Sequence, residues 1–98
     1  MAKTVKWSKK SLKSLRSIVN YLQDEVSENV ANNFIDTVYR QIDSLTKHPD
    51  KGRRALKTKT IRFVNIDKHR QLFYRVHGKT LFISIFFDTR QNPNKRSY

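Results

Sequence analysis

The side chains best suited to chemistry in this 98-residue chain are its cations, since 21 lysines and arginines against eight acids give a net charge of +13. Residues 1–16 hold six basic and no acidic residues, residues 17–50 two basic and six acidic, and residues 51–98 thirteen basic and two acidic. A surface that is merely soluble usually mixes both signs. The two basic segments therefore predict a partner that is a polyanion or an acidic protein.

Other reactive side chains are few. The chain has no cysteine, which excludes disulfides and cysteine-based metal sites and fits a reducing compartment. Its three histidines, His48, His69 and His77, fall at a predicted helix end or beside predicted turns, where surface histidines are common. We expect no metal and no cofactor. No apolar run reaches the roughly 18 residues of a membrane span, and the first residues lack an apolar signal core, so we expect a cytoplasmic protein.

The elements that must position these cations follow from the hydrophobic spacing. Residues 4–8 alternate apolar and polar side chains, which predicts a short strand. Ser8 and Ser27 are good N-caps, and each precedes apolar residues repeating every three or four positions, the pattern of two amphipathic helices. Pro49 ends the second helix near His48. Because their connection is short, the helices should form an antiparallel hairpin.

After a basic loop the period changes from 3.6 to 2. Residues 60–66, 70–76 and 80–87 read as three strands joined by short turns, hence an antiparallel meander. The predicted fold class is α+β, with the order β-α-α-β-β-β and an antiparallel sheet packed on the helix hairpin. Residues 1–98 form one domain, in which 88–98 are a basic C-terminal tail.

The alternation of side chains predicts a second apolar surface on the sheet. Phe73, Phe82 and Phe86 should share the face opposite the helices. Exposed aromatic side chains of this size often mark the seat of a partner. The alternative is that a loop or the tail covers them.

The order of elements, with "HPDKGRR" after the second helix, "LFYRV" before a tight turn and "FFDTRQNP" after the last strand, resembles the RelE/ParE superfamily of bacterial toxins. The resemblance covers nearly the whole chain and implies the toxic half of a type II toxin–antitoxin pair. Some members cleave messenger RNA in the ribosomal A site without a metal, whereas the ParE branch poisons DNA gyrase. A cognate antitoxin neutralises either kind with a mostly disordered segment.

The resemblance to the nucleases implies catalytic roles for three residues. Arg62 falls at a second-strand lysine of RelE, Arg90 at the arginine after its last strand, and Tyr98 at its C-terminal tyrosine. Such cations would stabilise charge on the scissile phosphate. Gln71 departs from the family's third-strand arginine, and Asp88 stands where some nucleases carry His or Tyr. Arg62 equally fits a solvated or interstrand-paired arginine.

The remaining expected contacts are with partners. The candidate RNA-binding residues are the cations Arg53, Arg54, Lys57, Lys59, Arg70, Arg75 and Lys95. The candidate antitoxin-binding residues are Phe73, Phe82 and Phe86. The expected partners are an acidic cognate antitoxin and either the ribosome with its mRNA or DNA gyrase, and no membrane.

Three functions remain open from the sequence. A ribosome-dependent endoribonuclease is favoured, because the net charge of +11 on residues 51–98 suits binding to the phosphate-lined ribosomal A site. A ParE-like gyrase poison without nuclease activity is the alternative. A non-catalytic basic nucleic-acid-binding module is the second alternative, although the chain shows no helix-turn-helix, zinc or RNP signature.

Overall fold

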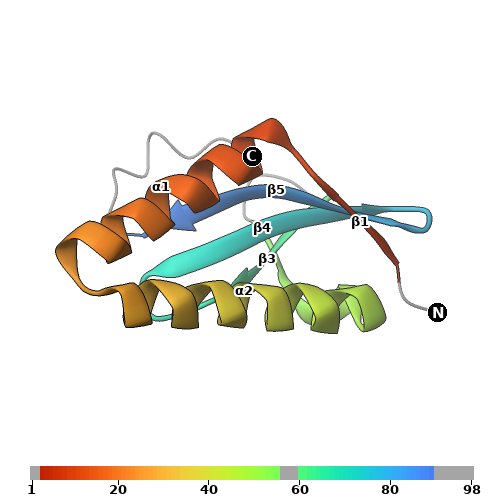
Figure 1. The fold of residues 1–98 in the computed structure, drawn as a ribbon. Coiled ribbons are helices and arrows are strands. Elements are labelled where there is room, and N and C mark those ends of the chain that lie inside the picture. The colour runs from red at the N-terminus through yellow and green to blue at the C-terminus, as the bar shows by residue number, and fades with distance from the viewer. Residues whose placement is uncertain (1–2, 56–59, 90–98) are drawn as a thin grey trace.

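The computed structural model describes residues 3–55 and 60–89, which form two helices packed on a five-stranded sheet (Figure 1). Strand β1 (Thr4–Trp7) leads into helix α1 (Lys9–Glu25) and then helix α2 (Glu28–Lys47). The remaining elements, in chain order, are the 3-10 turn η1 (Pro49–Lys51), β2 (Arg53–Arg54), β3 (Ile61–Asn65), β4 (Arg70–His77) and β5 (Thr80–Asp88). The predicted α+β fold class and element order are confirmed.

Both helices begin at the predicted serine caps. The Ser8 hydroxyl accepts a hydrogen bond from the Ser11 backbone N–H at 2.9 Å, and the Ser27 hydroxyl accepts one from the Val30 N–H at 3.1 Å. These bonds satisfy N–H groups that have no partner inside a helix. Helix α2 ends before Pro49, as expected. Neither helix is long and apolar enough to cross a membrane among the residues described.

The sheet has the order β1-β5-β4-β3-β2. Strands β3, β4 and β5 form the predicted antiparallel meander, but β1 pairs with β5 in parallel, so the sheet is mixed. Strand β2 was not predicted, because two residues are too short to show a period of two. It pairs antiparallel with β3 at the opposite edge, inside the segment that the sequence indicated as a basic loop.

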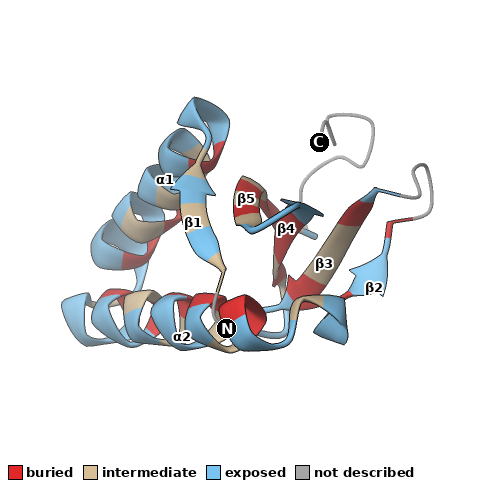
Figure 2. Ribbon diagram, turned by 90° about the vertical axis from the view of Figure 1, so that its right-hand side faces the viewer, coloured by how far each residue is buried: buried red, intermediate tan, exposed pale blue. Residues whose placement is uncertain are grey.

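Apolar residues are buried on both faces of the sheet. The main core joins the apolar stripe of α2 and part of α1 to the helix side of β4 and β5, which lie between α1 and β3 in Figure 2. A second cluster on the other face consists of Ala55, Ile61, Phe73 and Phe87, with Phe63 and Ile85 packed against it.

A β-bulge in β5 overturns one sequence prediction. Phe73 pairs with Ile85, but the next residue of β4, Tyr74, pairs with Ile83, which leaves Ser84 as the extra residue. An extra residue reverses the faces of everything beyond it. Phe86 therefore lies in the main core, stacked on Trp7 with ring centroids 5.9 Å apart, and not on an exposed face with Phe73 and Phe82. Phe73 keeps its predicted face but is buried.

Candidate functional site

The basic turn that follows α2 is held by one buried tyrosine. The Tyr74 hydroxyl donates a hydrogen bond to the Pro49 carbonyl at 2.7 Å and accepts one from the Gly52 backbone N–H at 2.9 Å. Desolvation by burial raises the pKa of Tyr74, so the hydroxyl keeps its proton at neutral pH and can act as donor. The turn is thus tied to the middle of the sheet from both its ends.

The candidate catalytic residue Arg62 donates hydrogen bonds to the same turn. Arg62 pairs with Tyr74 across β3 and β4. Its Nη1 donates to the Gly52 carbonyl at 2.8 Å and to the Asp50 carbonyl at 3.4 Å. Hydrogen bonds of a charged donor are stronger than those of a neutral one. Arg62 and Tyr74 together form a clamp around residues 49–52.

Gly52 is required by the closeness of this clamp. A Cβ atom at this position would lie 2.7 Å from Tyr74 Cε1 and 2.9 Å from the Phe63 carbonyl oxygen. Both separations are well inside van der Waals contact, one of the two atoms is backbone, and the Tyr74 ring is fully buried. Any side chain at residue 52 would push the turn off the sheet.

The clamp fixes two cations on either side of Gly52. Lys51 Nζ donates to Gln41 Oε1 at 2.9 Å and to Ser44 Oγ at 3.1 Å, which anchors it to α2. Arg53 begins β2 and is exposed, and its side chain has no hydrogen bond or ion pair with another described residue. Between them lies a cleft of about 200 Å³, lined by Gln41, Lys51, Arg53, Phe63, Val64 and Asn65.

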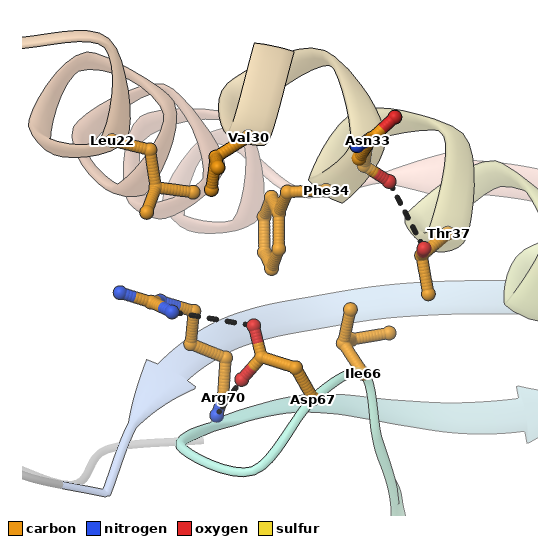
Figure 3. A pocket seen from close by; sticks show the side chains of 8 residues that line it. All are labelled: Leu22, Val30, Asn33, Phe34, Thr37, Ile66, Asp67 and Arg70. Carbon is orange, nitrogen blue, oxygen red and sulfur yellow. Dashed lines mark hydrogen bonds and ion pairs between the residues drawn. The ribbon is translucent and has the colours of Figure 1, made fainter. Parts of the chain in front are cut away.

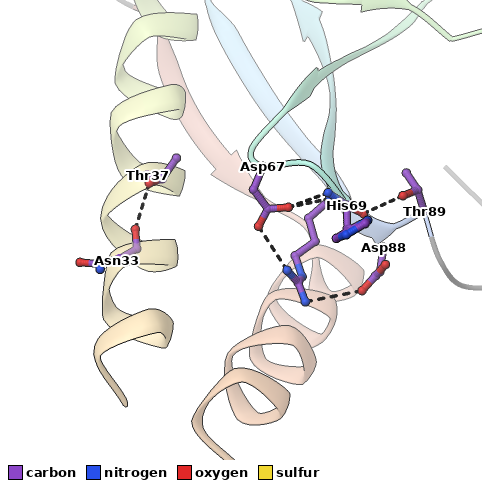
Figure 4. Close-up of polar contacts among 7 residues, drawn as sticks. Asn33, Thr37, Asp67, His69, Asp88 and Thr89 are labelled. Carbon is purple, nitrogen blue, oxygen red and sulfur yellow. Dashed lines mark hydrogen bonds and ion pairs between the residues drawn. The ribbon is translucent and has the colours of Figure 1, made fainter. Parts of the chain in front are cut away.

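Arg70, one of the predicted RNA-binding residues, lies buried in an ion cluster. Its side chain is only 8% exposed, and its Nη1 and Nη2 lie 3.2 Å from Asp67 and 3.7 Å from Asp88 (Figure 4). Asp67 also accepts hydrogen bonds from the backbone N–H groups of His69 and Arg70. Arg70 pairs with Asp88 in the β4–β5 register, so the turn between β3 and β4 brings all three charges together. The cluster joins that turn to the end of β5.

A second cavity lies above this ion cluster. It measures about 220 Å³ and is lined by Leu22, Val30, Asn33, Phe34, Thr37, Ile66, Asp67 and Arg70 (Figure 3). The Arg70 guanidinium stands 5.8 Å from the centre of the Phe34 ring, a cation–π contact that adds to its two ion pairs. Its Nε is buried without a hydrogen-bond partner among the described residues.

The other predicted site residues are spread over the molecule. Arg54 is exposed on β2, and Arg75 lies 4.3 Å over the Phe82 ring on β5. Gln71 donates to Asn65 Oδ1 at 3.4 Å. The residues that fall outside the described part of the chain are Arg90 and Tyr98 of the catalytic set, and Lys57, Lys59 and Lys95 of the RNA-binding set. Among the residues described, no three His, Asp or Glu side chains are grouped as metal ligands.

The sheet order and the helix hairpin packed on the sheet match a ParE/RelE-like fold. The model of the family "ParE toxin of type II toxin-antitoxin system, parDE" matches residues 5–93. The chain therefore belongs to the ParE toxin family, and it is a toxin of a type II toxin–antitoxin system.

Solved structures of low sequence identity share the fold. A chain of the chromosomal ParDE toxin–antitoxin system from P. aeruginosa is 17% identical, with a TM-score of 0.74 over 89% of this chain and 96% of that one. A chain of the toxin–antitoxin complex RelBE2 from Mycobacterium tuberculosis is 12% identical, with a TM-score of 0.60 over 90% of this chain and 99% of that one. No curated protein matches this sequence.

Proposed function

We propose that this toxin is a ParE-like poison of DNA gyrase, which acts by binding and does not cleave RNA. The observation that carries the proposal is the position of Arg62. A nuclease of this superfamily would need that cation on the scissile phosphate, whereas here it donates to the carbonyl groups of Gly52 and Asp50. A guanidinium that is hydrogen-bonded to backbone carbonyls stabilises the turn and is poorly placed to contact a substrate phosphate.

Two further observations support this reading. The family model that matches is that of ParE. The middle of the sheet face opposite the helices is apolar, with Phe63, Phe73, Ile85 and Phe87 in one cluster. A phosphate-rich substrate would find few cations there, since Arg75 is stacked on Phe82 and Gln71 replaces an arginine of the nucleases. These features favour a gyrase poison over a nuclease.

The test is induced expression in a bacterium with two readouts in the same culture. We expect a DNA-damage reporter to rise while primer extension on a translated reporter mRNA shows no new ends. Arg62→Gln should reduce growth inhibition only as far as it reduces folded protein, because its role is structural. Codon-phased cuts in the mRNA without DNA damage would establish the nuclease instead.

We also propose a cognate antitoxin as partner, bound through an acidic, amphipathic segment that folds on the toxin. Both solved relatives come from toxin–antitoxin systems. Of the three predicted aromatic contacts, Phe82 remains the best placed, since it is only half-buried and carries Arg75 beside it. A cation next to an apolar side chain suits an acidic amphipathic ligand.

Phe82→Asp should weaken the antitoxin complex at least about tenfold, the effect of losing roughly 1.4 kcal/mol of binding. The domain should stay folded, because the new carboxylate faces Arg75. Leu12→Asp is the matched control on α1, where the leucine is exposed. Titration calorimetry with the purified antitoxin measures both, and equal affinities for the two variants would place the antitoxin contact elsewhere.

A further inference from the structure

The polar side chains that line the cleft beside the clamped turn are rich in hydrogen-bond donors. Lysine has no acceptor, so Lys51 must meet the oxygen of the Gln41 amide, as it does at 2.9 Å. In the same way, the Asn65 amide oxygen accepts a hydrogen bond from the Gln71 amide. Each amide therefore has its NH₂ group left over, and neither donates to another described residue. A cleft lined by donors selects a ligand that is rich in acceptors.

Two cations add charge to this set of donors. Lys51 uses two of its three protons on Gln41 and Ser44, which leaves one for a ligand. Arg53 is exposed and unpaired among the described residues. No carboxylate is found among the described residues that line the cleft. The ligand should therefore be an anion.

We propose that this cleft binds a phosphate group in the backbone of a nucleic acid. The donors reach it from α2, η1, β2 and β3, and a tetrahedral phosphate presents acceptors in several directions, whereas a carboxylate is flat. The volume of about 200 Å³ lies below the roughly 300 to 1,000 Å³ of sites for whole small molecules. Arg54, next along β2, is also exposed and unpaired among the described residues, and it is available for a neighbouring phosphate.

The clamp makes this a pre-formed site. Lys51 and Arg53 flank Gly52, whose backbone N–H and carbonyl are held by Tyr74 and Arg62. The backbone positions of Lys51 and Arg53 are therefore set before a ligand arrives, and Lys51 Nζ is already anchored to α2. This order lowers the entropic cost of binding. The proposal goes beyond the gyrase mechanism and does not depend on it.

The experiment is fluorescence anisotropy with a short fluorescein-labelled DNA strand and purified toxin, at one fixed salt concentration. Arg53→Gln should weaken binding at least about tenfold, the loss of one charged hydrogen bond. Gln41→Leu should weaken it several-fold without changing the net charge. Lys9→Gln is the matched control, because it removes the same charge from the exposed start of α1, where a cation opposes the helix dipole.

The outcomes separate the possible ligands. Equal losses of DNA affinity for Arg53→Gln and Lys9→Gln would mean that binding depends only on the net charge of the toxin. That result would overturn the proposed site. A second outcome is that inorganic phosphate displaces the labelled DNA as readily as unlabelled DNA does at the same concentration of phosphate groups. That result would assign the cleft to the free ion. Tighter binding of an acidic peptide than of DNA, lost in Arg53→Gln, would assign it to a protein partner. The proposal stands only if DNA binds best and Gln41→Leu weakens it.

Discussion

Arg70→Met is expected to lower the free energy of unfolding by about 3 to 5 kcal/mol, the usual result of removing one partner from a buried ion pair. Asp67 and Asp88 would both lose the Arg70 cation, and the Asp88 side chain is only 13% exposed. The methionine would also lose the contact with the Phe34 ring. Since a small domain has only about 5 to 15 kcal/mol of stability, this loss would remove a large part of the margin against unfolding.

Urea unfolding followed by circular dichroism measures this effect. Arg75→Met is the control, because Arg75 is an exposed strand arginine whose side chain lies over the Phe82 ring. It should cost no more than about 1 kcal/mol. A third variant, Asp67→Asn, should cost less than Arg70→Met, since Asp67 is 39% exposed and Asp88 still faces the cation. Wild-type stability for Arg70→Met would show that the cluster contributes nothing to the fold.

Gly52→Ala is expected to be the second most damaging change, at about 2 to 4 kcal/mol, as overpacking adds to lost hydrogen bonds. The added Cβ would lie 2.7 Å from a ring atom of Tyr74. Relief requires the turn to move away, which breaks the bonds from Gly52 to Tyr74 and Arg62. DNA binding at the adjacent cleft should fall in parallel.

Gly78→Ala is the matched control for this prediction. Gly78 has a φ of +59°, but a Cβ there would meet nothing within 4 Å. It should cost only about 1 kcal/mol of backbone strain and leave DNA binding unchanged. If thermal unfolding shows Gly52→Ala to be no worse than Gly78→Ala, the clamp is looser than its distances indicate.

The elements of this fold could be predicted from local signals. Ser8 and Ser27 precede amphipathic stripes, and Pro49 cannot continue a helix, so the helix ends follow from short-range chemistry. Strand β2 gave no such signal, because Arg53 and Arg54 have neither alternation nor apolar character. The bulge at Ser84 gave no signal either, since "TLFISIFF" alternates in either register. The observed register places Phe86 in the main core against Trp7, a tertiary contact.

The site could be predicted only in part. The basic segment that carries Arg53 was recognised from its charge, but the partners of Arg62 and Arg70 were not. Each of those arginines meets groups brought to it by tertiary structure: Arg62 by the turn after α2, and Arg70 by the register of β4 against β5. The spacing of Asp67 and Arg70, three residues apart, and the acid at Asp88 were the available hints.

The most direct test of the central claim is a reaction of purified DNA gyrase with supercoiled plasmid, ATP and the purified toxin, analysed after protein denaturation. A gyrase poison should leave linear plasmid in proportion to toxin concentration, and the antitoxin should abolish it. Arg75→Met should retain the effect, whereas Gly52→Ala should reduce it only as far as it lowers the amount of folded toxin. No linear plasmid at any toxin concentration, together with site-specific cleavage of mRNA on purified ribosomes, would contradict the account.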